Sequence, residues 1–142
     1  ALPFYGNLKD ESLDVFNSTL SPNIDIEKFI SGKGLESLYF DRFNKRISAS
    51  EIFLDKDKNA EFIKNFYNRL ARSLSILINT IDPDAIVFGG GVSNEIKELD
   101  NIKEMSFNFA GKKNIQTNFL KPKFGDASGV RGAALLDRNT SI

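Results

Sequence analysis

The sequence of 142 residues contains neither cysteine nor histidine. Without these residues the chain cannot form disulfides, use a thiolate or build a zinc site from cysteine and histidine ligands. Catalysis by a serine–histidine or cysteine–histidine pair is excluded as well. A general base in this chain would therefore be an aspartate, glutamate, lysine or tyrosine.

Neither sign of charge is in excess, because 19 lysines and arginines balance 19 aspartates and glutamates. Binding to nucleic acid through its phosphates needs a clustered basic surface, so we expect no nucleic-acid partner. No apolar run in the sequence approaches the roughly 20 residues of a membrane span, and no signal peptide is visible. We therefore expect no membrane partner and a cytoplasmic location.

The strongest periodic pattern predicts a helix over residues 60–81. Its apolar residues recur every three or four positions, at Ile63, Phe66, Tyr67, Leu70, Ala71, Leu74, Leu77, Ile78 and Ile81. Pro83 disfavours helical geometry at Asp82 and ends this helix. Upstream, residues 21–31 favour a short helix that Gly32 and Gly34 end, residues 35–43 favour a second one, and residues 48–51 fit a capping box.

The second half of the chain alternates strands and helices. Residues 85–88 (AIVF) are typical of a buried, parallel strand. We expect a helix from Ser93 or Asn94 to about Ala110, a strand within residues 114–120 and a last helix over residues 125–136. This order predicts an α/β fold for residues 1–142, one domain with helices packed on a sheet.

Three consecutive glycines, Gly89, Gly90 and Gly91, separate the strand at residues 85–88 from the next helix. Glycine accepts positive φ and lets a ligand contact the main chain, and a helix start offers free N–H groups. The alternative is a tight turn without a ligand, and the spacing alone favours neither. The dinucleotide-binding and P-loop patterns are both absent.

A second glycine cluster contains Gly125, Gly129 and Gly132. For Gly132 and Ala133 we favour close helix packing. Whether the start of this segment, at Gly125 and Asp126, faces a ligand stays open.

Three segments in this order resemble the C-terminal half of a sugar kinase of the bacterial ROK family (repressor, open reading frame, kinase). They are residues 24–39 (IDIEKFISGKGLESLY), residues 78–94 (INTIDPDAIVFGGGVSN) and residues 125–136 (GDASGVRGAALL). Within the first segment, residues 26–34 (IEKFISGKG) are most similar to fructokinase-like and mannokinase-like members, while glucokinase and N-acetylhexosamine kinase members stay possible. The resemblance implies one lobe of an actin/hexokinase/RNase H-like ATPase fold, ATP- and Mg²⁺-dependent phosphorylation of a hexose such as fructose, and a homodimer.

The resemblance also assigns site residues. Glu27 matches a glutamate that hydrogen-bonds sugar hydroxyls, and Gly89, Gly90 and Gly91 match the glycines against which the nucleotide lies. Without the resemblance, the favoured interpretation of Glu27 is a solvated carboxylate in the first turn of a helix.

Two departures from the family pattern stand out. Asp25 occupies the place of a zinc-binding cysteine, so we expect no zinc. The phosphate loop and the catalytic aspartate of the family are expected upstream of Ala1, in an N-terminal lobe. We therefore expect this chain to be a fragment that lacks catalytic residues and has no kinase activity alone.

Two other functions stay open at this point. The first is the sugar-sensing lobe of a ROK-family transcriptional repressor, which an upstream DNA-binding helix-turn-helix would distinguish from a kinase. The second is an α/β interaction domain that binds no ligand.

Overall fold

The computed structural model describes residues 30–112 and 114–123. In these ranges the elements are α3 (Gly32–Phe43), α4 (Ala49–Leu54), α5 (Ala60–Ile81), β1 (Ala85–Val87), α6 (Gly91–Glu95), α7 (Leu99–Ala110) and β2 (Asn118–Leu120). The expected helix at residues 125–136, most of the helix at residues 21–31, and Glu27 lie outside the described residues.

Helix α5 is the central element, and the sequence predicts both of its ends. Its apolar face supplies much of the core, with Phe66 fully buried and in ring contact with Phe53 of α4. The helix ends at Asp82, which adopts a left-handed conformation (φ 50°) and donates its N–H to the Ile78 carbonyl. The ring of a proline disfavours helical geometry at the residue before it, so Pro83 explains why the helix ends here.

A buried polar residue ties α3, α4 and the start of α5 together. Asn59, which is 4% exposed, accepts a hydrogen bond of 3.0 Å from the hydroxyl of Tyr39 in α3. Its amide nitrogen donates to the carbonyl of Ile52 in α4 at 2.9 Å. Because both bonds are buried, they fix the relative positions of the three helices.

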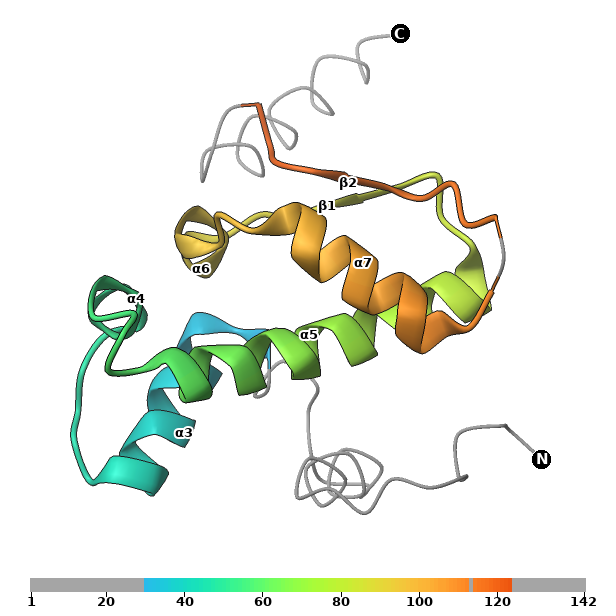
Figure 1. The fold of residues 1–142 in the computed structure, drawn as a ribbon. Helices are drawn as coiled ribbons and strands as arrows, with labels where there is room; N and C mark the ends of the chain where they lie inside the picture. The colour runs from blue at the N-terminus through green and yellow to red at the C-terminus, as the bar shows by residue number, and fades with distance from the viewer. Residues whose placement is uncertain (1–29, 113, 124–142) are drawn as a thin grey trace, which may run out of the picture.

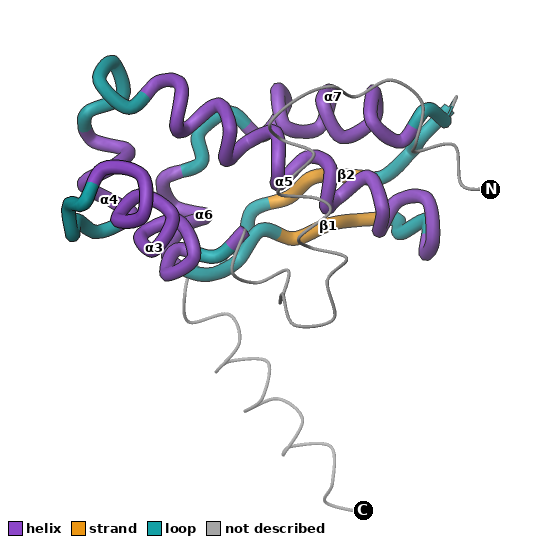
Figure 2. The backbone as a smooth tube through the Cα atoms, turned by 90° about the horizontal axis from the view of Figure 1, so that it is seen from below, coloured by secondary structure: helices purple, strands orange, loops and turns teal. Residues whose placement is uncertain are grey.

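The strands β1 and β2 pair in parallel, as the sequence predicts, with Ile86 opposite Phe119 and Val87 opposite Leu120. Helix α7 packs on α5 and on β2, and Phe107 and Phe119 meet edge to face. Figure 2 shows the two strands side by side, with α3, α4 and α6 gathered at one end.

The expectation of a fully buried strand at residues 85–88 is wrong. Val87 is 58% exposed and its neighbour Leu120 is 47% exposed. Among the described residues, α7 covers the face that carries Phe119, and the face that carries Val87 and Leu120 is open.

Two helix boundaries also differ from the prediction. Gly32 and Gly34 lie inside α3, which Ser31 caps, while most of the helix that they were expected to end lies outside the described residues. The helix expected from Ser93 to Ala110 is divided into α6 and α7, and Ser93 lies inside α6 instead of at its cap. The break falls at Ile96, whose backbone is extended and whose side chain is 2% exposed in the core.

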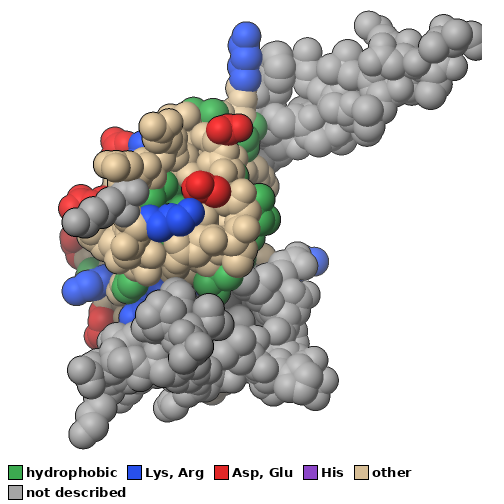
Figure 3. Space-filling view, turned by 90° about the vertical axis from the view of Figure 1, so that its right-hand side faces the viewer, with side chains coloured by type: hydrophobic (Ala, Val, Ile, Leu, Met, Phe, Trp, Pro, Cys, Tyr) green, Lys and Arg blue, Asp and Glu red, His purple; other side chains and the backbone are tan. Residues whose placement is uncertain are grey.

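The surface of the described part carries both signs of charge. On the face shown in Figure 3, acidic and basic side chains are interspersed. Among the described helices, none combines the length and the apolar character needed to cross a bilayer.

Candidate functional site

A hollow bordered by described residues lies where β1 ends, at the three glycines. Its volume is about 640 Å³, within the range typical of small-molecule sites. The walls come from the start of α3, the start of α4 and the loop into α6. The lining residues are Ile30, Ser31, Gly32, Lys33, Glu36, Ser48, Ala49, Ser50, Gly89, Gly90, Gly91, Val92 and Glu95.

Three helices begin at this pocket. Helix α3 starts at Gly32, α4 at Ala49 and α6 at Gly91, and all three residues line the hollow. The starts are close together: a Cβ built on Gly32 would lie 3.7 Å from the Cβ of Val92 and 3.8 Å from that of Ala49. Protein acceptors already take several of the first N–H groups: that of Gly34 donates to the Ser31 hydroxyl, and that of Ala49 donates to the Glu36 carboxylate.

The glycines leave open space in this wall. A Cβ added to Gly89, Gly90 or Gly91 would meet no other atom within 4 Å. Of the three, Gly90 has a backbone conformation (φ +83°) that L side chains rarely adopt. The local structure therefore explains the glycine at position 90, and neither packing nor backbone geometry explains those at positions 89 and 91.

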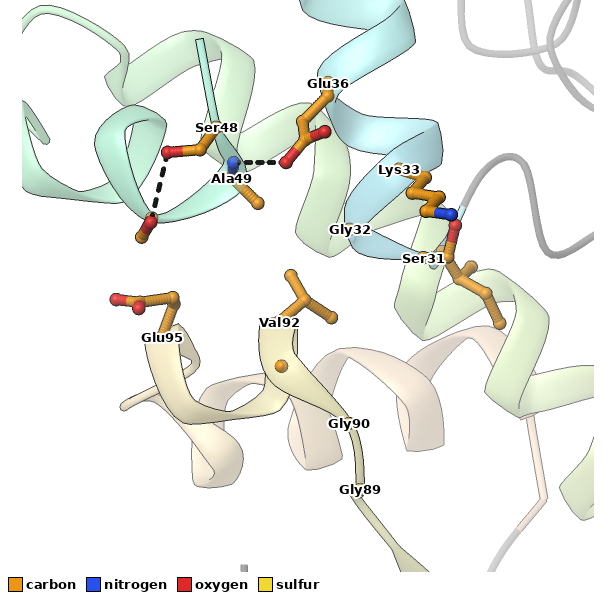
Figure 4. A pocket seen from close by; sticks show the side chains of 13 residues that line it. Ser31, Gly32, Lys33, Glu36, Ser48, Ala49, Gly89, Gly90, Val92 and Glu95 are labelled. Carbon is orange, nitrogen blue, oxygen red and sulfur yellow. Dashed lines mark hydrogen bonds between the residues drawn. The ribbon is translucent and has the colours of Figure 1, made fainter. Parts of the chain in front are cut away.

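Glu36 joins the two helices of the pocket wall. Its Oε1 accepts a hydrogen bond of 2.9 Å from the N–H of Ala49, so it caps α4 from α3. The carboxylate is thereby held at the pocket edge. Glu95 projects from α6 on the other side of the pocket, and Lys33 lies beside Ser31 (Figure 4).

The predicted capping box of α4 is present. The Ser48 hydroxyl accepts from the Glu51 N–H, and the Glu51 carboxylate accepts from the Ser48 N–H at 2.7 Å. Hydrogen bonds from the side chain and backbone of Ser48 lower the pKa of Glu51 from its usual value. The box fixes Ser48 and Ala49, which line the pocket.

The structure places Gly89, Gly90 and Gly91 in one pocket, and it does not describe Glu27. Sequence reasoning missed the two partners of the glycine loop, the starts of α3 and α4. The signals were present, because Ser31-Gly32 and the Ser48–Glu51 box both mark helix starts. Their convergence on the glycines is a tertiary relation that no local pattern contains.

The donor set of the described residues does not fit a metal. No group of three His, Cys, Asp or Glu residues that could hold an ion occurs in residues 30–112 and 114–123. The pocket does fit an organic ligand with a flat apolar part, because the space above the glycines is open and Ile30 and Val92 flank it.

Comparison with known proteins identifies the class. Residues 25–140 match the model of the ROK family. N-acetyl-D-glucosamine kinase of Histophilus somni (strain 129Pt) is 38% identical over 119 residues, which cover 78% of this chain and 38% of that protein. The proteins of the same name from Mannheimia succiniciproducens (37%) and Pectobacterium carotovorum (36%) match with the same coverage.

The chain belongs to the ROK family. This family implies an actin/hexokinase-like ATPase fold, and the described helices with their short parallel sheet are compatible with part of one lobe. The chain spans 38% of the length of these curated relatives. The predicted resemblance is therefore confirmed, and the predicted preference for fructokinase-like members finds no support among these relatives.

Proposed function

We propose that the protein containing these residues is an ATP-dependent sugar kinase and that the glycine pocket holds the adenosine part of ATP. The single observation that carries this proposal is the open space above Gly89 and Gly91. A flat ring could lie directly on this backbone, and a side chain at either position would occupy the same space.

The other walls suit a nucleoside. Ile30 and Val92 offer apolar contacts to a base. Glu36 and Glu95 are carboxylates at the pocket edge, and carboxylates accept hydrogen bonds from ribose hydroxyls.

ATP would supply the phosphoryl group, with Mg²⁺ neutralising its charge. The described residues offer no ligand set for the metal. We propose that the metal ligands and the catalytic aspartate lie in a separate N-terminal lobe, and that this chain contributes nucleotide contacts together with Glu27 for the sugar. On this proposal the 142 residues alone do not turn over ATP.

The relatives guide the choice of sugar. All three relatives named above are N-acetyl-D-glucosamine kinases, so we propose an N-acetylated or simple hexose as substrate, with N-acetyl-D-glucosamine tested first. Fructose, which residues 26–34 suggest, is the second substrate to test.

The test measures sugar phosphorylation by the full-length protein and by the variant Gly91→Val. The new side chain would project into open space inside the pocket, so we expect KM for ATP to rise about tenfold or more, with KM for the sugar unchanged. Gly111→Ala is the matched control, because Gly111 is a positive-φ glycine that does not line the pocket. It is expected to leave both constants unchanged.

Three outcomes separate the alternatives. A Gly91→Val protein with unchanged KM for ATP contradicts the placement of the nucleotide. Sugar binding by the full-length protein without any phosphoryl transfer identifies a sugar-sensing regulator. Absence of both ATP binding and sugar binding leaves an interaction domain.

A further inference from the structure

The carboxylate of Glu36 is bonded at one oxygen and free at the other. Its Oε1 accepts the hydrogen bond from the Ala49 N–H, and no described residue donates to Oε2. The side chain is partly buried, but Oε2 is not among the buried polar atoms that lack a partner, so solvent reaches it. A ligand in the glycine pocket, which Glu36 lines, can therefore contact this oxygen.

The hydrogen bond to Ala49 also fixes where Oε2 lies. Ala49 is the first residue of α4, and the Ser48–Glu51 capping box holds the start of that helix. Figure 4 shows the Glu36 carboxylate between α3 and the start of α4, with its second oxygen turned away from Ala49. A side chain that is already ordered loses little conformational entropy when a ligand binds, so Oε2 is a preorganised acceptor.

The other charged side chains of the pocket are not held in this way. In the described part of the chain, the side chains of Lys33 and Glu95 form no hydrogen bond or ion pair. A ligand that used either of them would first have to order it, at a cost in conformational entropy. Glu36 is therefore the charged residue of this pocket that is best prepared to determine specificity.

The chemistry of a carboxylate oxygen decides which part of a nucleotide it recognises. An ionised carboxylate accepts hydrogen bonds and cannot donate them, and hydroxyl groups form short, strong bonds to it. The phosphate oxygens of a nucleotide are anionic acceptors themselves, so the charge of Glu36 repels them. The ribose hydroxyls fit this acceptor, and the amino group of adenine is the competing donor that the test below separates from them.

We propose that Oε2 of Glu36 accepts a hydrogen bond from a ribose hydroxyl, so that the glycine pocket selects ribonucleotides over nucleotides that lack this hydroxyl. This selectivity rests on the function proposed above, in which the pocket holds the adenosine part of ATP. The alternative is that Glu36 serves only as a cap for α4.

The test titrates the full-length protein by calorimetry in the presence of Mg²⁺. The probes are ADP, 2′-deoxy-ADP, 3′-deoxy-ADP and purine riboside diphosphate, which lacks the amino group of adenine. ADP should bind at least about tenfold more tightly than one of the two deoxy analogues, the factor expected for a hydrogen bond to a charged group. This ratio of affinities is the ribose preference of the protein.

Three variants locate the ribose preference. In Glu36→Ala the acceptor is gone, so the preference should fall to about one. Glu36→Gln can still accept the Ala49 N–H and cap α4, but its neutral amide is the weaker partner, so the preference should fall to about threefold. Glu95→Ala is the matched control, because it removes the same charge from the same pocket and should keep the wild-type preference.

Several results would overturn the proposal. They are a wild type without ribose preference, a preference that survives in both Glu36 variants, and a preference that is lost in Glu95→Ala instead. A Glu36→Ala protein that stops distinguishing ADP from purine riboside diphosphate, and keeps the ribose preference, shows that Glu36 contacts the base. If Gly91→Val binds ADP as tightly as the wild type, the nucleotide site itself is misplaced and both proposals fail. If Gly91→Val binds ADP weakly and the Glu36 variants keep the preference, only the ribose contact is wrong.

Discussion

The core around α5 and the loop at the three glycines differ in what explains their sequences. In the core, each large side chain is accounted for by its neighbours, as with Phe66, which is fully buried against Phe53 and Tyr67. In the loop, a Cβ atom built on Gly89 or Gly91 would have no other atom within 4 Å. A sequence feature that the protein's own packing does not explain is a reason to look for a ligand.

The largest expected effect lies in the core. Phe66→Ala should lower the free energy of unfolding by about 3–5 kcal/mol, because it deletes a fully buried ring and leaves a cavity. Urea unfolding of the full-length protein measures the change. Leu54→Ala is the control: Leu54 is 81% exposed, so its change should stay within about 0.5 kcal/mol. Equal effects of the two substitutions would contradict the described core.

The next effect tests the polar link between the helices. Asn59→Ala removes a hydrogen bond from Tyr39 and another to Ile52, and it leaves both partners buried. The expected loss is about 2–3 kcal/mol in the free energy of unfolding. In the control, Asn79→Ala, the lost bond to the Ala110 carbonyl is exposed, and a loss below about 1 kcal/mol is expected. A smaller loss for Asn59→Ala than for this control would show that the buried link does not form.

A pair of glycine substitutions contrasts the loop with an ordinary helix end. Gly111→Ala places a side chain at φ +64° and should cost about 1 kcal/mol of stability. Gly91→Ala meets no neighbour and needs no unusual backbone angle, so its cost should stay within about 0.5 kcal/mol. The affinity for nucleotide should fall in Gly91→Ala and stay unchanged in Gly111→Ala, which is the reverse of the order expected for stability. If Gly91→Ala destabilises the protein as much as Gly111→Ala, the glycine is structural.

The last effect is absent at neutral pH and appears only in alkaline solution. Burial raises the pKa of Tyr67 from 10.0 to about 12 in the folded state, so the folded protein keeps this proton when the unfolded chain has lost it. The associated stability is complete below pH about 10 and is lost as the pH rises toward 12. Urea unfolding of Tyr67→Phe should therefore show a shallower decline over this range than the wild type. Parallel declines would contradict the raised pKa.

Local patterns predicted the elements that local chemistry determines. Helix α5 follows from its apolar period and from Pro83, and the α4 start follows from its capping box. The division of the helix expected over residues 93–110 was not predictable, because it depends on the burial of Ile96 in the core. The open face at Val87 was missed for a similar reason: an apolar strand does not reveal which of its faces is covered.

The site was predictable in part. The glycine run marked one wall, from the physical properties of glycine and from the resemblance to the ROK family. The other walls, at Ser31 and Ser48, are set by contacts between helices that are distant in sequence. The role of Glu36 as a cap for α4, thirteen positions away, is likewise a product of the fold.

The most direct test is a crystal structure of the full-length protein with a non-hydrolysable ATP analogue. We predict that the adenosine contacts the backbone of Gly89 and Gly91, between the starts of α3 and α6. A nucleotide bound elsewhere, with the space above these glycines filled by the protein's own side chains, would contradict the account.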